Sequence, residues 1–184
     1  YDVRKHGSGN AGLTNFYRTY GAKYALLVIA CDMGKTVAAC LLGSFFFRCL
    51  GWDGTLGTLL AGLGCELGHI FPVFYGLRGG KGILSGGTLV LLLNRRVAAV
   101  AWALFLLLWL TTRYVSLASI TATCSAPITV YFVYGHNWLY TGLCLAVAAL
   151  VVWCHRENIQ RLLHGTEKKF KWHVNPTEGK DPPK

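Results

Sequence analysis

Residues 7–18 read Gly-Ser-Gly-Asn-Ala-Gly-Leu-Thr-Asn-Phe-Tyr-Arg, and an apolar run from Ala22 to Phe47 follows them almost directly. About 20 helical residues cross a bilayer, so this run is long enough to span a membrane. Glycine lets the backbone turn its N–H groups inward, and such groups beside a helix N-terminus attract anions. We therefore expect a phosphate-binding loop at the edge of a membrane; the alternative for the loop alone is a flexible polar connector.

The polar residues of this loop suit an oxyanion. The guanidinium of Arg18 is a planar fork that matches phosphate, and the hydroxyl and amide side chains add neutral donors. The candidate residues of the loop are Ser8, Gly9, Asn10, Gly12, Thr14, Asn15 and Arg18.

The composition is that of a membrane protein. Of 184 residues, 53% are hydrophobic and 14% are charged, against roughly 25% charged in soluble domains. The net charge of +10 would suit nucleic acid, but the basic residues lie at the ends of apolar runs, so we expect no nucleic-acid partner. We expect one domain over residues 1–169 and a polar, flexible tail at 170–184.

The sequence predicts neither a metal site nor a cofactor. The eight carboxylates are scattered, whereas Mg²⁺ and Ca²⁺ need clustered oxygen ligands. The seven cysteines form no CxxC pair and are interpreted as reduced apolar residues. The glycine spacing in residues 7–12 fits a dinucleotide-binding loop, but no strand precedes it and a membrane helix follows, which excludes that interpretation.

Six apolar runs separated by short polar breaks predict an all-α, polytopic membrane helix bundle with six spans. The third run has only about 11 residues, which is short for a span unless its ends lie inside protein. The runs cover residues 22–47, 54–77, 83–93, 97–112, 117–133 and 138–154.

This alternation places the chemically loaded segments on one side of the membrane. If residues 7–18 face one side, so do the breaks after residues 77 and 112 and the segment from His155 onward. Fourteen of the 18 lysines and arginines fall on that side, three fall on the other, and Lys35 lies within a span. The bias follows the positive-inside rule and predicts a shared site at the cytoplasmic face.

The break after residue 77 supplies a second phosphate-binding candidate. Glycine N–H groups at a helix start, together with one cation, suit an anion. The candidates here are Gly79, Gly80, Lys81 and Gly82. The segment is not a P-loop, because Tyr75 stands where the first glycine is required and Gly82 follows the lysine. An inter-helix turn with a snorkelling lysine is the alternative.

Charges inside the runs add further candidates. Asp32 and Lys35 share a helix face within a span, where charge is expensive and marks function by default; an internal ion pair is the alternative. His69 lies in an apolar run. It is either a site residue or a hydrogen-bonded buried histidine.

The later breaks hold two more groups. Arg113, Ser116 and Ser119 are spaced by three, so we expect them on one helix face, where they suit an oxyanion; serines bonded to helix carbonyls are the alternative. His155 and Asn158 also share a face and are expected at headgroup level. A solvated helix end is the alternative for this pair.

Taken together, these segments resemble the bacterial acyl-phosphate-dependent glycerol-3-phosphate acyltransferases, which are integral inner-membrane enzymes. The matching segments occur in family order and spread over nearly the whole chain. They are 7–15 with Arg18, Asp32-x-x-Lys35, 68–74 with 79–82, 113–120 and 155–167. The sequence departs from the family pattern after Gly82, where Ile-Leu-Ser-Gly replaces residues closer to Val-Ala-Thr.

The resemblance implies a seven-helix fold, of which this sequence carries six helices and begins after the first. It implies acyl transfer from acyl phosphate to the 1-hydroxyl of glycerol 3-phosphate, which gives lysophosphatidic acid and phosphate. Neither coenzyme A nor acyl carrier protein is then the direct donor. The leaving phosphate takes the hydroxyl proton, so no classical base is needed. The implied location is the bacterial inner membrane, multi-pass, with the active site facing the cytoplasm.

The same resemblance assigns roles. Ser8, Gly9, Asn10 and Gly12 are expected to hold acyl phosphate, with Lys81 clamping phosphate charge. Glycerol 3-phosphate is expected to be positioned by Arg18, Ser116, His155 and Asn158. The catalytic candidates are Ser8, Asn10, Lys81, Ser116 and His155. The remaining substrate-binding candidates are Thr14, Asn15, Lys35, His69, Gly79, Gly80, Gly82, Arg113 and Ser119.

A small organic-anion or phosphate carrier is the alternative from another functional class. Carriers place charged sites near the bilayer midplane between repeated halves. Asp32 and Lys35 favour that interpretation, but no internal repeat is visible. A headgroup transferase or phosphatase would need clustered acids or histidines, which the sequence lacks.

Overall fold

The computed structural model describes residues 2–171, and over these residues the secondary structure is helical. The order of elements agrees with the predicted all-α class. The elements are η1 (Val3–Lys5), α1 (Leu13–Tyr20), α2 (Ala22–Cys49), α3 (Gly54–Ile70), η2 (Val73–Tyr75), α4 (Ile83–Leu93), α5 (Arg95–Thr112), α6 (Val115–Val133), α7 (Trp138–Cys154) and α8 (Arg156–Leu163).

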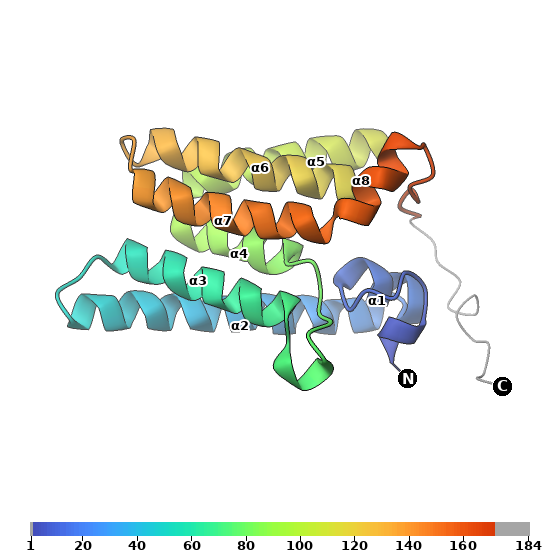
Figure 1. Cartoon of the computed structure of the whole chain (residues 1–184), viewed down its shortest axis with the longest axis horizontal. Coiled ribbons are helices and arrows are strands. Elements are labelled where there is room, and N and C mark those ends of the chain that lie inside the picture. Colours follow the sequence, from blue (N-terminus) through green and yellow to red (C-terminus); the bar gives the residue numbers. More distant parts are fainter. Residues whose placement is uncertain (1, 172–184) are drawn as a thin grey trace.

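The helices run back and forth along one axis, so their connections gather at two ends of the bundle (Figure 1). One end holds α1, the connection from α3 to α4, the junction of α5 and α6, and α8. The turns at 50–53, 94 and 134–137 lie at the other end. The predicted meeting of the four chemically loaded segments is therefore confirmed, and we call their end of the bundle the site end.

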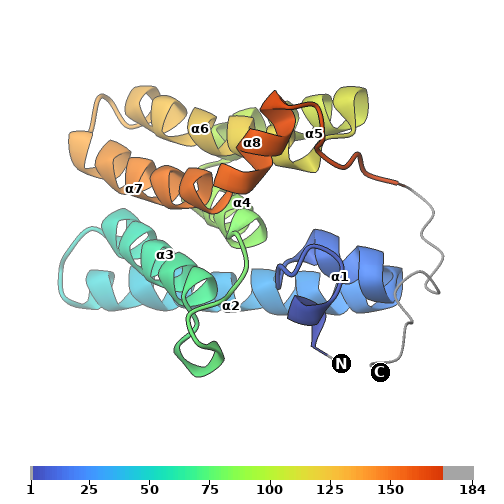
Figure 2. The same cartoon turned by 45° about the vertical axis from the view of Figure 1, so that its right-hand side comes forward.

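The bundle has two layers with α4 between them. The pair α2 and α3 lies on one side and the group α5, α6 and α7 on the other (Figure 2). The central helix α4 contacts α2, α3, α5 and α6. These neighbours cover its polar Ser85 and Thr88, which are both buried. An 11-residue helix is thus accommodated inside protein, as the short third run required.

Four helical segments are long and apolar enough to cross a membrane: α2, α5, α6, and α3 continued through η2. A fifth arises if α7 and α8, which are bent by 60° at their junction, count as one span. The number of six spans remains a prediction. The first two membrane helices pack closely, because Gly43 on α2 and Gly57 on α3 bring the two backbones into contact that any added Cβ would break.

The end of α3 agrees with the sequence prediction, whereas the junction of α5 and α6 does not. The helix α3 ends before Pro72, as a proline without an N–H group predicts. Arg113 does not lie on the face of α6, because α6 begins at Val115 and Arg113 ends α5 in a left-handed conformation with φ 62°. The predicted helix face shared by Arg113 and the two serines is therefore wrong.

The tail predicted from residue 170 lies mostly outside the described residues. Phe170 is described, and it packs its ring against Tyr17 and Trp109, with centroid separations of 5.3 Å in both cases. Its backbone N–H donates to the carbonyl of Arg113 at 2.8 Å. The described residues after α8, 164–171, therefore return to the bundle at the site end.

Candidate active site

A cavity of about 910 Å³ occupies the site end and extends between the helices. Its inner part is apolar and is formed by α4, α5, α6 and α7, with Leu89, Trp102, Phe105, Ala126 and Val147 among its lining residues. Its outer part is polar. Sixteen of the eighteen predicted site residues line the cavity, and the two that do not are Lys35 and Arg113.

Helix starts surround the polar part of this cavity, and they lack side-chain caps. The starts of α1, α4, α6 and α8 each contribute lining residues, and none has a side-chain hydrogen bond at its N-cap. At the opposite end, Asp53, Asn94 and Asn137 cap α3, α5 and α7. The first N–H groups of a helix need acceptors and favour anions. The bundle thus concentrates anion-attracting helix starts at the cavity.

The loop before α1 is built around Asn15, which is almost fully buried. The side-chain oxygen of Asn15 accepts the N–H of Ser8 at 2.9 Å, and its amide nitrogen donates to the carbonyls of Val3, His6 and Asn10. The backbone has φ > 0 at Gly7 and Gly9 but not at Gly12, the extended N-cap of α1. Asn15 therefore positions the loop, since its polar atoms are already bonded within it.

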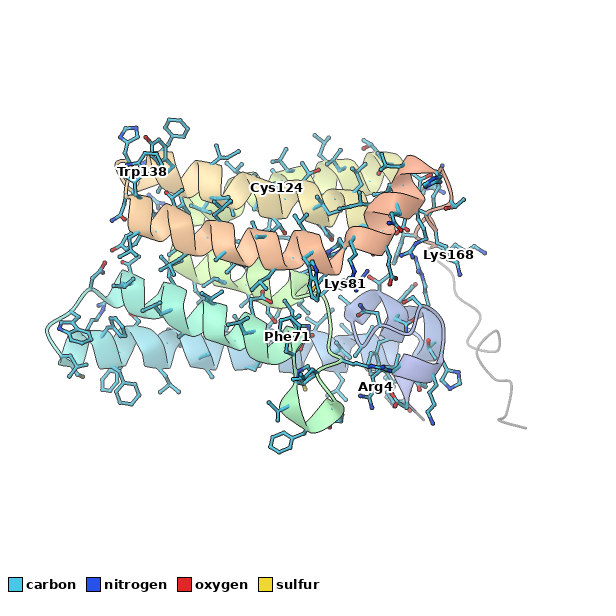
Figure 3. All side chains as sticks on the ribbon, viewed as in Figure 1. Arg4, Phe71, Lys81, Cys124, Trp138 and Lys168 are labelled. Carbon is cyan, nitrogen blue, oxygen red and sulfur yellow. The ribbon has the colours of Figure 1, made fainter. Side chains whose placement is uncertain are left out.

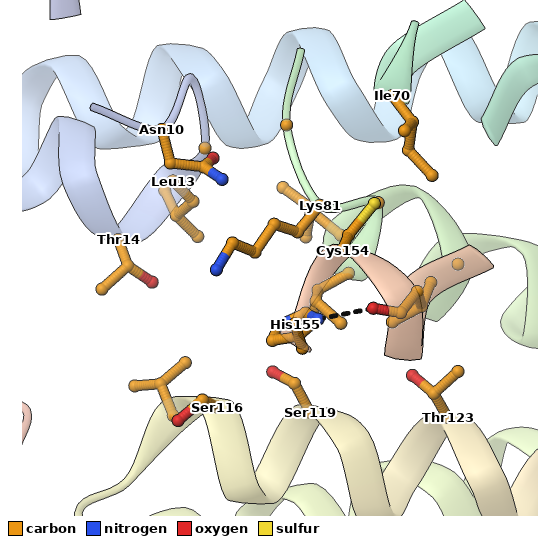
Figure 4. A pocket seen from close by; sticks show the side chains of 18 of the residues that line it. Asn10, Leu13, Thr14, Ile70, Lys81, Ser116, Ser119, Thr123, Cys154 and His155 are labelled. Atoms are coloured by element: carbon orange, nitrogen blue, oxygen red, sulfur yellow. Dashed lines mark hydrogen bonds between the residues drawn. The ribbon is translucent and has the colours of Figure 1, made fainter. Parts of the chain in front are cut away.

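The backbone N–H groups that face the cavity are not those of the expected residues Ser8 and Gly9. The N–H of Ser8 goes to Asn15 and the N–H of Gly9 donates to the carbonyl of His6 at 3.0 Å, so neither is left for a ligand. The start of α1 takes their place, because Gly12, Leu13 and Thr14 line the cavity there. The side chains of Asn10 and Thr14 lie at the same wall (Figure 4).

Glycines in the connection from α3 to α4 are required by close packing. A Cβ at Gly79 would overlap the carbonyl oxygen of His69, and a Cβ at Gly80 would overlap its imidazole ring. Gly82 has φ 79° and its Cα faces the carboxyl of Glu66. The connection therefore lies flat on α3, which fixes the backbone on both sides of Lys81.

The charged residues Asp32 and Lys35 of α2 contact His69, on which this connection packs. The Lys35 ammonium lies 2.6 Å from Asp32 Oδ1 and 2.6 Å from His69 Nδ1. The internal ion pair that stood as the alternative for Asp32 and Lys35 is present within α2, and it extends to His69, which packs against Gly80. Lys35 is exposed and does not line the cavity, whereas its partners Asp32 and His69 do.

Lys81 reaches into the cavity from this connection and lies between α1 and the α7–α8 junction (Figure 4). Its ammonium donates to the side-chain oxygen of Asn158. Burial lowers the pKa of Lys81, and repulsion from Arg161 lowers it further. The amide of Asn158 on α8 links Lys81 to residues 164–171 after that helix, since Asn158 also donates to Glu167.

Glu167, which follows α8, joins three side chains at the cavity wall. The sequence did not predict it as a site residue. Its carboxylate accepts hydrogen bonds from Ser116 at 2.8 Å, from Asn158 at 2.7 Å and from Arg161 at 2.7 Å. Burial would raise the pKa of Glu167, but these three donors outweigh burial and hold the pKa below its ordinary value. The carboxylate thereby fixes three donors from α6 and α8 at the cavity wall.

His155 lies at the junction of α7 and α8, buried and lining the cavity. Its Nδ1 lies 2.8 Å from the carbonyl oxygen of Val151. Because a carbonyl oxygen only accepts, Nδ1 carries the proton, and Nε2 is left as an acceptor in the neutral ring. Ser116, Ser119 and Thr123 follow one another along the facing side of α6 (Figure 4). Thr123 extends the predicted serine pair by one turn.

Arg18 lines the cavity and is half-buried, which lowers its pKa, while the nearby Glu167 opposes that effect. Arg113 is exposed and contributes its backbone carbonyl, which receives Phe170, so its guanidinium is not among the lining groups. Among the described residues, the cavity wall carries the cations Arg18, Arg78, Lys81, Arg156, Arg161 and Lys168, which suit an anionic ligand.

Comparison with known proteins shows the family of this chain. The family model described as glycerol-3-phosphate acyltransferase matches residues 1–165. The glycerol-3-phosphate acyltransferase of Syntrophomonas wolfei is 40% identical over 169 residues, which cover 92% of this chain and 83% of the relative. That of Aquifex aeolicus is also 40% identical, over 92% of this chain and 85% of its own length.

Two solved structures have the same fold. The crystal structure of PlsY (YgiH), an integral membrane glycerol 3-phosphate acyltransferase, in its glycerol 3-phosphate form gives a TM-score of 0.81 at 38% identity, over 93% of this chain and 83% of that one. Its lysophosphatidic acid form gives 0.79 at 39% identity, over 90% and 82%. The chain is an integral membrane protein, and it belongs to the glycerol-3-phosphate acyltransferase family.

Proposed function

We propose that this protein transfers a fatty acyl group from acyl phosphate to the 1-hydroxyl of glycerol 3-phosphate, producing lysophosphatidic acid and inorganic phosphate. The observation that carries the proposal is the two-part cavity. Cations that include Arg18, Lys81 and Arg161 surround its outer part together with four uncapped helix starts, and apolar side chains of α4 to α7 line its inner part. Such a cavity suits two phosphates at one end and a hydrocarbon chain at the other.

The proposed reaction needs no protein nucleophile. The 1-hydroxyl oxygen attacks the acyl carbonyl carbon, so that a new ester C–O bond forms. The bond between the carbonyl carbon and the phosphate oxygen breaks, and the phosphate leaves with the hydroxyl proton. Lys81 and the helix starts stabilise the charge that develops on the carbonyl oxygen and on the leaving phosphate. This scheme uses neither a metal nor a cofactor.

The contacts of the cavity wall support a division of roles. Asn10, Thr14 and the start of α1 are proposed to hold acyl phosphate, with Lys81 between the two phosphates. Ser116, Asn158 and Arg161 share the carboxylate of Glu167 and are proposed to position glycerol 3-phosphate together with Arg18. His155 Nε2 is proposed to accept a hydrogen bond from a substrate hydroxyl. Ser8 and Ser119 complete the lining of the two sites.

The distribution of charge supports an orientation with the site end in the cytoplasm of a bacterial cell. Fourteen lysines and arginines belong to that side and three to the other. The carrier alternative loses its main support, because Asp32 and Lys35 form an ion pair that also contacts His69, and Lys35 does not line the cavity. We therefore retain the transferase.

The donor is tested with the full chain in liposomes, given glycerol 3-phosphate and either palmitoyl phosphate or palmitoyl-coenzyme A. We expect lysophosphatidic acid from palmitoyl phosphate alone, and a loss of roughly 10²–10³ in kcat in Lys81→Ala. Formation of product from the coenzyme A ester only would reject acyl phosphate as the donor. Uptake of glycerol 3-phosphate without any product would favour a carrier.

A further inference from the structure

The connection from α3 to α4 carries an apolar loop that projects from the side of the bundle. We call residues 71–78 the aromatic loop. Within it, Val73 is 77% exposed, Phe74 96% and Tyr75 62%. The loop extends sideways past α2 instead of prolonging the bundle along its axis (Figures 1 and 3). In a membrane protein whose helices run along that axis, this direction lies in the plane of the bilayer.

The backbone of the aromatic loop is bonded to itself. The N–H groups of Tyr75 and Leu77 donate to the carbonyl of Pro72 at 3.0 and 3.1 Å, and the neck is closed by Gly79 donating to Ile70 at 3.1 Å. Unsatisfied backbone groups are costly in an apolar medium, so this internal bonding lets the short helix η2 and its flanking turns sit close to hydrocarbon. The loop is therefore adapted to a low-polarity environment.

Basic side chains accompany the exposed aromatic residues. The guanidinium of Arg4 lies over the ring of Tyr75 at 5.2 Å, and its Nη1 donates to the carbonyl of Tyr75 at 3.3 Å. Arg78 is exposed at the other end of the loop. Aromatic rings beside cations are typical of the boundary between headgroups and acyl chains, where cations meet lipid phosphates.

The inner side of the same loop is a wall of the catalytic cavity. Phe71, Leu77 and Arg78 line that cavity. Phe71 packs against Trp153 of α7 with ring centroids 5.9 Å apart. A single short segment thus has one side in the cavity and the other side directed outward in the bilayer plane.

We propose that the aromatic loop is a bilayer-interface anchor, which inserts at the boundary between headgroups and acyl chains and admits the amphiphilic donor to the cavity from the bilayer. Its partner is the lipid surface. The tip is apolar and exposed, as are Leu41, Leu42 and Phe45 of α2. Arg78 supplies a cation for anionic headgroups, and Arg4, which is paired with Asp2, adds a second. The route of the donor rests on the proposed use of a long-chain acyl phosphate.

The anchor is tested first without reference to activity. Phe74→Cys is made in a chain whose exposed cysteines are removed by Cys31→Ser, Cys49→Ser and Cys124→Ser. A nitroxide at position 74 is then exposed to oxygen and to a water-soluble nickel chelate, in vesicles of phosphatidylcholine and phosphatidylglycerol. We expect collisions with oxygen to exceed those with the chelate. Free access of the chelate, or protection from both reagents as under a second copy or another protein, would overturn the proposal.

The route is tested by Phe74→Asp in the same vesicles. Because burial of a phenyl ring is replaced by a charge, we expect the KM for palmitoyl phosphate to rise roughly tenfold, with kcat and the KM for glycerol 3-phosphate unchanged. Trp138→Asp is the matched control, since Trp138 is 73% exposed at the opposite end of the bundle (Figure 3). A fall in kcat alone, or an equal rise in KM in Trp138→Asp, would reject the route. If acyl phosphate is no substrate of the wild type, the proposed function fails, while the nitroxide still decides the anchor.

Discussion

The hydroxyl of Ser116 donates a hydrogen bond to Glu167 Oε1 at 2.8 Å, which joins residues 51 positions apart in the sequence. The first partner lies on α6 and the second follows α8, so this contact closes the site end over the cavity. Asn158 donates to the same oxygen at 2.7 Å. One carboxylate oxygen thus sets the positions of two side chains proposed to hold glycerol 3-phosphate.

This shared acceptor predicts strong coupling between Ser116→Ala and Glu167→Gln. Because a hydrogen bond to a charged group contributes about 1.5–3 kcal/mol, we expect each single change to lower kcat/KM for glycerol 3-phosphate by roughly 10- to 100-fold. The double variant should lose little more than either single variant, as a double-mutant cycle measures. Ser125→Ala is the control, since Ser125 bonds to the carbonyl of Ala122 on the same helix. Additive losses would contradict the coupling.

The packing of Gly80 on His69 predicts that one methyl group disturbs the site. In Gly80→Ala, the new Cβ has to displace the imidazole ring, at a cost of about 1–3 kcal/mol in unfolding free energy, typical of overpacking. We expect kcat to fall at least about tenfold, because Lys81 is the next residue. Gly68→Ala is the matched control, since nothing lies within 4 Å of its added Cβ. A thermal melt and an activity assay should find Gly68→Ala near wild type; equal loss in both variants would refute the packing argument.

The lowered pKa of Lys81 predicts an early alkaline limit of activity. Lysine is charged only below its pKa, so a clamp on phosphate is lost as pH rises through that pKa. In the pH profile, kcat/KM should therefore decrease on the alkaline side with a midpoint below the ordinary lysine pKa of about 10.4. Lys81→Arg should move the limb upward, because guanidinium stays protonated, while the acid limb stays in place. An alkaline limb that is the same in both proteins would assign it to another group.

The apolar depth of the cavity predicts control of chain length. Ala122 on α6 lines the cavity, whereas Cys124, two residues on, is exposed on the other side of the helix. We expect Ala122→Phe to raise the KM for palmitoyl phosphate roughly tenfold and to leave that for an octanoyl donor nearly unchanged, by shortening the space for the chain. Cys124→Phe should change neither. Equal effects on both donors would show that the chain binds elsewhere.

The arrangement of the fold was predictable because it depends on long runs. Apolar runs and the side on which the basic residues fall brought residues 7–18, the α3–α4 connection, α6 and His155 to one end, and the structure agrees. The start of α4 at Ile83 and its end at Leu93 also match the third run. Helix boundaries and the side of each connection depend on many residues at once, so the conformation of a single residue does not change them.

Individual side-chain roles were less predictable, because they depend on a few dihedral angles. The amide of Asn15 suits a phosphate or a backbone equally well, and only the fold turns it inward. The left-handed conformation of Arg113 separates it from the serines that its spacing seemed to join. Glu167 was placed in a polar segment after the last apolar run, and nothing in its local pattern indicates a return to α6. The available signal was that Glu167 ends the segment 155–167, which matches the family pattern.

The central claim is acyl transfer at a site built around Lys81, and phosphate release tests it most directly. The detergent-purified full chain is given palmitoyl phosphate with and without glycerol 3-phosphate. We predict release that requires glycerol 3-phosphate, equals the lysophosphatidic acid formed, and falls by roughly 10²–10³ in Lys81→Ala. Release that is independent of glycerol 3-phosphate, or that Lys81→Ala leaves intact, would contradict the account.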